Sequence, residues 1–185
     1  MIKKLSIRLT LAVLIGLGGV IVAHKYMFPY GDRSFTLRHM SAVLDTYATD
    51  HFGKFPDSPH GPYDALRKLY PDYSLGPELA GVSGKIKAVK SALDQGKSLD
   101  GSLTSWVYVP GFEQSDDPGL AILWESREGL YANGKRNSFG GRAVLFISGA
   151  VTNIPAGAWT SFLTNQEHLQ QMARARRNST NNVRQ

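Results

Sequence analysis

The side chains that most often bind metals in proteins are few in this sequence and scattered along it. None of the 185 residues is cysteine, which excludes disulfides and thiolate metal sites. The five histidines show neither of the two spacings, H-x-x-x-H and H-E-x-x-H, that present paired imidazoles to zinc. They are His24, His39, His51, His60 and His168. We therefore expect no metal site and no cofactor.

Two adjacent carboxylates, Asp116 and Asp117, lie in a loop rich in proline and glycine. Calcium takes about six to eight oxygen ligands, and Glu113 is the only other carboxylate close to this pair in the sequence. Calcium binding by the loop stays an open alternative, and no metal ligand is assigned.

Glu125 follows the apolar run Leu120–Trp124 and is the one polar residue to which the sequence assigns a role. We expect a paired, half-buried carboxylate that ties down the following loop. A catalytic acid would need a second carboxylate, and the sequence places none near it. Ser41, Ser105 and Ser148 lack the sharp turn that presents a nucleophilic serine. The sequence thus predicts no catalytic residue and a protein that is not an enzyme.

The net charge of +6 is concentrated at the two ends of the chain. The first 33 residues carry five basic residues against one acidic, and residues 160–185 carry four against one. Between them, residues 34–159 hold 12 basic and 13 acidic residues. A nucleic-acid-binding domain places its positive charge on the folded body, so nucleic acid is not an expected partner. Basic ends are more typical of a protein at a membrane surface.

An uncharged apolar stretch, Leu9–Ala23, predicts a transmembrane anchor near the N-terminus. Its 15 residues are fewer than the ~20 that a spanning helix needs, but the flanking basic and aromatic residues extend it. The basic residues before it predict a cytoplasmic N-terminus. A cleaved signal peptide is the alternative, with Ala23 before the cut and the bulky Ile21 where a small residue is preferred. The predicted anchor residues are Leu9, Leu11, Val13, Leu14, Ile15, Leu17, Val20, Ile21 and Val22.

Beyond the anchor, apolar periodicity predicts helices first and strands afterwards. Apolar residues recur every three or four positions over Ser34–His51, which predicts an amphipathic helix. Its expected buried residues are Leu37, Met40, Val43, Leu44, Tyr47 and Phe52. Shorter helices are predicted over Tyr63–Tyr70 and Ser83–Gln95. Strands are predicted over Thr104–Val109, Leu120–Trp124, Arg142–Ile147 and Val151–Ile154, with a tight hairpin at Ser148-Gly149.

This order of elements predicts an α+β fold in three parts. Residues 1–30 form a cytoplasmic stub and the transmembrane helix. Residues 31–159 form an extracytoplasmic domain in which the long amphipathic helix packs on a small antiparallel sheet. Residues 160–185 form a polar helix, with a thin apolar stripe of Phe162, Leu163, Leu169 and Met172, followed by a disordered basic tail from Asn178.

Five stretches resemble type IV pilin-like proteins, and among these the pseudopilin-related proteins of the H-X9-DG type from planctomycete and verrucomicrobial bacteria. They are LDTYATDHFGKFPDS (Leu44–Ser58), YDALRKLYPDY (Tyr63–Tyr73), SWVYVPG (Ser105–Gly111), LAILWES (Leu120–Ser126) and GGRAVLFISGAV (Gly140–Val151). The resemblance covers residues 35–155 and implies a pilin-like fold, with an acidic residue at Glu125. The chain departs from the family at Lys3–Leu14, which lacks the glycine and glutamate of a prepilin cut site. Ser148 and Ala150 also replace the aspartate and histidine that the family carries around the final glycine.

The resemblance implies a membrane-anchored structural protein whose extracytoplasmic domain binds other proteins, related to the pseudopilins of secretion or pilus-like systems. The expected partners are the lipid bilayer and other membrane or pilin-like proteins. The expected location is the bacterial inner membrane, with a single span and the main domain in the periplasm. Two alternatives stay open: an accessory subunit of a larger membrane complex that uses the same fold as a scaffold, and a periplasmic hydrolase.

Overall fold

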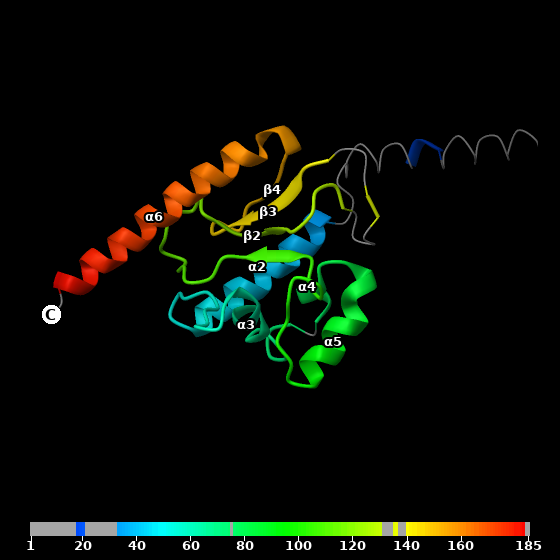
Figure 1. Ribbon diagram of the computed structural model, residues 1–185, viewed down its shortest axis with the longest axis horizontal. Coiled ribbons are helices and arrows are strands. Elements are labelled where there is room, and N and C mark those ends of the chain that lie inside the picture. The colour runs from blue at the N-terminus through cyan, green and yellow to red at the C-terminus, as the bar shows by residue number, and fades with distance from the viewer. Residues whose placement is uncertain (1–17, 21–32, 75, 131–134, 137–139, 184–185) are drawn as a thin grey trace, which may run out of the picture.

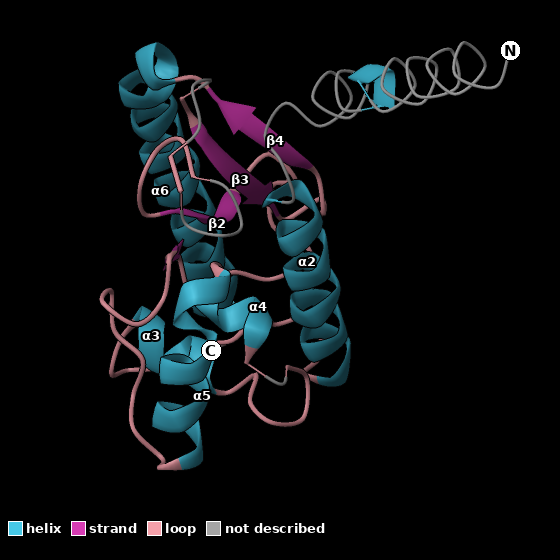
Figure 2. Cartoon of the chain, turned by 90° about the vertical axis from the view of Figure 1, so that its right-hand side faces the viewer, coloured by secondary structure: helices cyan, strands magenta, loops and turns pink. Residues whose placement is uncertain are grey.

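Helices cover both faces of a four-stranded antiparallel sheet in the computed structural model, which describes residues 18–20, 33–74, 76–130, 135–136 and 140–183. Helix α2 (Arg33–Asp50) lies on one face of the sheet and helix α6 (Trp159–Val183) on the other (Figures 1 and 2). Three short helices between α2 and the first strand form a further helical segment beside the sheet (Figure 1).

Helix α2 confirms the amphipathic helix that the sequence predicts over residues 34–51, with bounds that differ by one residue. Leu37, Met40 and Leu44 are at most 1% exposed, and Tyr47 is also buried. Their spacing of three or four residues places them on one side of the helix. The helix ends where Phe52 and Gly53 both take positive φ angles and the Gly53 amide donates a hydrogen bond to the Ala48 carbonyl (2.7 Å).

The four predicted strands are confirmed as a meander in the order β1-β2-β3-β4. Each strand is antiparallel to the next, and Leu123 lies opposite Tyr108 on one side and Leu145 on the other. The strands are β1 (Trp106–Tyr108), β2 (Ala121–Glu125), β3 (Arg142–Phe146) and β4 (Val151–Ile154). The predicted tight hairpin joins β3 to β4, with Gly149 in the left-handed region at φ 77°.

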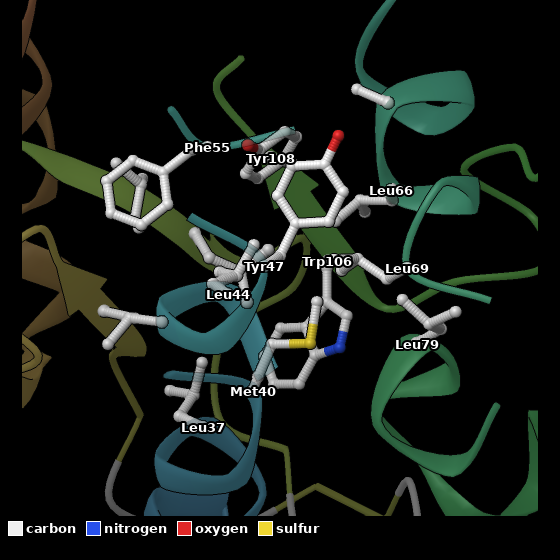
Figure 3. Close-up of a cluster of buried hydrophobic side chains, with 14 of the residues drawn as sticks. Leu37, Met40, Leu44, Tyr47, Phe55, Leu66, Leu69, Leu79, Trp106 and Tyr108 are labelled. Carbon is white, nitrogen blue, oxygen red and sulfur yellow. The ribbon is translucent and has the colours of Figure 1, made fainter. Parts of the chain in front are cut away.

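The helical segment between α2 and β1 supplies the rest of the core. It comprises α3 (Pro62–Arg67), α4 (Pro77–Ala80), the 3₁₀ turn η1 (Ser83–Lys85) and α5 (Ile86–Asp94). The sequence predicts α3 and α5 but not the four-residue α4. Figure 3 shows side chains from this segment, from α2 and from β1 meeting around the fully buried Trp106. The Trp106 ring nitrogen donates to the Glu78 carbonyl (2.7 Å), which satisfies its only polar atom.

Helix α6 follows the last strand and packs across the other face of the sheet. Phe162 meets Phe146 of β3 edge-to-face, with ring centroids 6.2 Å apart. Gln166 and Ala173 are buried, whereas Met172, predicted to lie in the apolar stripe, is 41% exposed. The helix continues to Val183, so most of the segment for which the sequence predicts disorder is helical.

The predicted transmembrane helix requires a correction. Of the predicted anchor residues, only Val20 is described. Those outside the described residues are Leu9, Leu11, Val13, Leu14, Ile15, Leu17, Ile21 and Val22. Within the described part of the chain, no helix combines the length and the apolar character needed to cross a membrane.

The two longest described helices, α2 and α6, cannot cross a membrane because each carries four charged residues. A charged side chain at the centre of a bilayer costs about 2.5–3.5 kcal/mol even on the most permissive scale. The fold class is corrected accordingly to α+β, a four-stranded antiparallel sheet with helices and without a described membrane-spanning helix. The predicted single-pass location in the inner membrane is overturned by the same finding.

Candidate interaction surface

Glu125 lies at the end of β2 and is only 2% exposed, more buried than the sequence predicts. Its Oε2 accepts a hydrogen bond from the backbone amide of Ala143 in β3 (2.9 Å). Within the loop between these strands, the Gly129 amide donates to the Gly141 carbonyl (2.7 Å). The carboxylate therefore joins the two ends of the loop, which is a structural task.

The carboxylates considered for calcium are engaged in other contacts. Asp116 accepts a hydrogen bond from the Glu113 amide (2.9 Å) and forms an ion pair with Arg177 of α6 (2.9 Å). Asp117 accepts one from the Gly119 amide (2.8 Å). These contacts fix the loop and attach it to α6. Among the described residues, no group of three or more histidine, aspartate or glutamate side chains could hold a metal ion.

The described histidines do not come together at one site. His51 stacks on Tyr47 with ring centroids 3.8 Å apart, and its Nδ1 lies 2.7 Å from the Tyr47 carbonyl oxygen. His60 donates its backbone amide to the Ser58 hydroxyl (3.2 Å), 9 positions along the chain from His51. Each of these contacts joins residues that are at most four positions apart in the sequence.

A groove of about 340 Å³ lies between α2 and the β3–β4 turn. Leu44, Phe55 and Ile122 contribute apolar side chains to it, whereas Arg38 and Asp45 add opposite charges from the exposed side of α2. Its remaining lining residues are Ser41, Ala42, Phe146, Ile147, Ser148 and Gly149. Two of the three serines considered as nucleophiles meet here, but no histidine is among the described lining residues to act as their base.

Phe52 is the most exposed large apolar side chain of the described domain, at 97%. Its φ of 57° is in the left-handed region, which disfavours any residue with a Cβ. Gln114 connects the turn of Phe52 to the groove: its backbone amide donates to the Gly53 carbonyl (2.8 Å), and its side-chain Nε2 donates to Asp45 Oδ1. We refer to the groove and Phe52 together as the interaction surface.

Periodicity assigned Phe52 to the core, and that assignment is wrong. Helix α2 ends at Asp50, so the three- or four-residue spacing no longer applies at position 52. The signal that identifies the exposed residue is Gly53, which favours a left-handed helix end directly beside it.

No protein-family model matches this chain, and no curated protein or solved structure matches it either.

Proposed function

We propose that this chain is a non-catalytic structural protein that binds another protein through the interaction surface, in the manner expected of a pilin-like domain. The partner is a protein with an apolar pocket for the Phe52 ring and an extended segment for the groove. The arrangement of α2 on an antiparallel meander supports the pilin-like part of the proposal, because the sequence resemblance implies that arrangement.

The observation that carries the proposal is the exposure of Phe52 in a strained conformation. Burying a phenylalanine side chain contributes about 1.5–3 kcal/mol, and folding of this chain gains almost none of it. The left-handed conformation costs a further ~1–2 kcal/mol. Aromatic side chains that fill a partner's pocket are frequent hot spots of protein interfaces. Binding would bury the Phe52 side chain and gain the free energy that folding does not.

The groove adds polar specificity to this apolar contact. Arg38 and Asp45, seven residues apart on α2, present opposite charges across an apolar floor. Charges at the rim of an interface select partners and orientation more than they raise affinity. A partner segment with an acidic residue at one end and a basic residue at the other would match this pattern.

Native purification of the full-length chain from the cells that produce it tests the proposal. We expect one stoichiometric partner, which the Phe52→Ser variant no longer retains at wild-type levels. Met172→Ser is the matched control, because Met172 is also an exposed apolar residue but lies on α6, across the sheet from α2. The proposal fails if wild-type protein purifies alone, or if both variants retain the partner equally.

A further inference from the structure

A second cavity, of about 280 Å³, lies away from the interaction surface. It forms where the turn η1 meets residues 101–105 and 126–130. Its described lining residues are Val82, Lys85, Gly101, Ser102, Ser105, Ser126, Arg127 and Leu130. This volume is close to the lower end of about 300–1,000 Å³ for small-molecule pockets, so a small ligand would fit.

Two cations line this cavity, and none of its described lining residues is acidic. Burial lowers the pKa of Lys85, and the neighbouring positive charge of Arg127 lowers that pKa further. The Lys85 ammonium donates one hydrogen bond, to the Thr104 carbonyl (2.9 Å), which leaves two of its three N–H groups for a ligand. Two like charges beside a partly buried space favour binding of an anion between them.

One carboxylate nearby, that of Asp100, acts against this effect, since its charge raises the pKa of Lys85. Asp100 does not line the cavity. Its Oδ1 already accepts hydrogen bonds from the Ser102 amide (2.7 Å), the Ser102 hydroxyl (2.6 Å) and the Leu103 amide (3.0 Å). The carboxylate is thus oriented by its own turn and keeps its negative charge, and two cations line the cavity against it.

Serine hydroxyls supply neutral hydrogen-bond donors next to the cations. Ser105 is only 3% exposed, and the Ser126 amide donates to its carbonyl (2.9 Å), which fixes these two residues side by side at the ends of β1 and β2. Lysine, arginine and hydroxyl donors around one space are the groups that proteins use to bind phosphate oxygens.

The segment that begins at Ser126 carries further basic residues. Residues 126–141 contain Arg127, Lys135 and Arg136 against a single acidic residue, Glu128. Lys135 and Arg136 are exposed. Clustered charges of one sign raise the local concentration of oppositely charged ligands.

We propose that this cavity binds a small phosphate-bearing anion, either inorganic phosphate or the phosphate group of a small ester, with Lys85 and Arg127 holding its oxygens. The site is separate from the interaction surface, and it does not depend on the proposed function. It involves no chemical step: the anion is bound and released unchanged.

The test is a titration of the full-length protein with inorganic phosphate and with a simple phosphate monoester at constant ionic strength, followed by amide NMR. We expect saturable shifts confined to residues 82–85, 101–105 and 126–130. Losing one charge-assisted hydrogen bond weakens binding about tenfold, so Arg127→Gln and Lys85→Gln should each raise the Kd by about that factor. Arg127 is exposed, so its variant is expected to fold even if the Lys85 variant does not.

The matched control is Lys87→Gln, an exposed lysine of α5 that does not line the cavity. It should leave the Kd unchanged. Saturation by the ester alone would support an ester as the ligand. Equal saturation by both anions would show that the phosphate group alone is enough for binding. The proposal is overturned by shifts that do not saturate with either anion, or by equal weakening in the Lys87 and Arg127 variants.

Discussion

Trp106 is the residue at which the sheet meets the helical segment. Its indole ring packs so closely on Gly81 that a Cβ at position 81 would lie 2.8 Å from the ring. Gly81 also has a φ of 74° at the end of α4. Both the close approach and the left-handed conformation therefore require glycine at this position.

Replacing Gly81 by alanine should lower stability for both reasons. Overpacking against a rigid buried ring costs about 1–3 kcal/mol, and the left-handed conformation adds ~1–2 kcal/mol. We expect thermal unfolding to show a clearly reduced Tm. Gly84→Ala is the control, because a Cβ there meets no atom within 4 Å. Equal Tm values for the two variants would show that the Trp106 ring moves to accommodate the added methyl group at no cost in stability.

Tyr108 connects stability to alkaline pH. It is 2% exposed and its hydroxyl donates to the Pro56 carbonyl (2.7 Å). Burial, with a smaller effect of the Asp57 charge, raises the pKa of Tyr108 well above its ordinary value of about 10. The folded state thus holds this proton more tightly than the unfolded state. That contribution to stability is complete below about pH 10 and is lost as the pH rises towards the folded pKa.

Urea unfolding of wild type and Tyr108→Phe at neutral pH and at about pH 11 measures this contribution. At neutral pH the variant should be less stable by about 0.5–1.5 kcal/mol, because the hydrogen bond to Pro56 is lost. At high pH the difference should shrink or reverse, since ionisation of Tyr108 stabilises the unfolded state and only wild type carries this hydroxyl. A constant difference across the range would mean that Tyr108 titrates alike in both states.

Glu125 and the residues of the two proposed sites differ in how far the sequence could identify them. Glu125 could be selected because it is a carboxylate directly after an apolar strand. Phe52 was misassigned because periodicity carries no information about where a helix ends. Lys85 and Arg127 are 42 positions apart in the sequence, and only the fold brings them to one cavity.

At the level of elements, α6 is held at both ends by polar contacts. Near its start, Gln166 accepts a hydrogen bond from the Ala121 amide (2.8 Å) and donates one to the Gly119 carbonyl (3.1 Å). Near its end, Arg177 pairs with Asp116, donates to the Gly111 carbonyl, and lies over the Phe112 ring at 5.3 Å. A buried glutamine thus extends the hydrogen bonding of β2 into the helix.

The Arg177 contacts predict a local effect of Arg177→Ala. The ion pair is partly buried, so its loss should cost more than the ~0–1 kcal/mol of an exposed pair. We expect faster amide hydrogen exchange in the last turns of α6, with the exchange of β2 and β3 unchanged. Glu167→Ala, at an exposed position of the same helix, should leave the exchange unaltered. Protection of the helix end that persists in Arg177→Ala would show that the apolar contacts alone hold it.

Two different signals explain which elements the sequence predicts to within two residues. Helix α2 repeats its buried side chains every three or four positions, and the four strands are short runs rich in β-branched and aromatic residues. Helix α4 has only four residues, too few to establish a period. The sequence does not reveal the docking of α6 because the inner face of this helix is partly polar, and only the tertiary structure supplies the partners of Gln166 and of the Arg177 Nη1 and Nη2 atoms.

At the scale of the whole molecule, the nearly neutral sum of charge over residues 34–159 conceals a local concentration of positive charge. Residues 34–159 carry nearly equal numbers of basic and acidic side chains, which argued against an anionic macromolecule as partner. The cavity beside Lys85 and Arg127 is nonetheless lined by these two cations, and no acidic residue is among its described lining residues. Net charge therefore bears on large ligands and says little about small ones.

The packing of α6 on the sheet bears on where the domain ends. The sequence places its end at residue 159, with α6 as an appendage, whereas the structure uses α6 to cover one face of the sheet. Trp159 meets Trp124 of β2 at a centroid distance of 6.2 Å and lies 4.3 Å from the Arg142 guanidinium. Each aromatic side chain of this layer contributes up to about 1.5–3 kcal/mol by burial, and each Gln166 hydrogen bond about 1 kcal/mol.

Together these contributions are comparable with the ~5–15 kcal/mol by which a typical domain is stable, so a chain ending at Ala158 should not fold cooperatively. We expect it to lose its near-ultraviolet circular dichroism or to aggregate through the uncovered sheet. A chain ending at Arg177 is the matched control, because it keeps Trp159, Phe162, Gln166 and the Asp116 ion pair. It should unfold in one transition with a Tm close to that of the full chain. If the shorter chain also unfolds cooperatively at that Tm, α6 is an appendage and the boundary at residue 159 is correct.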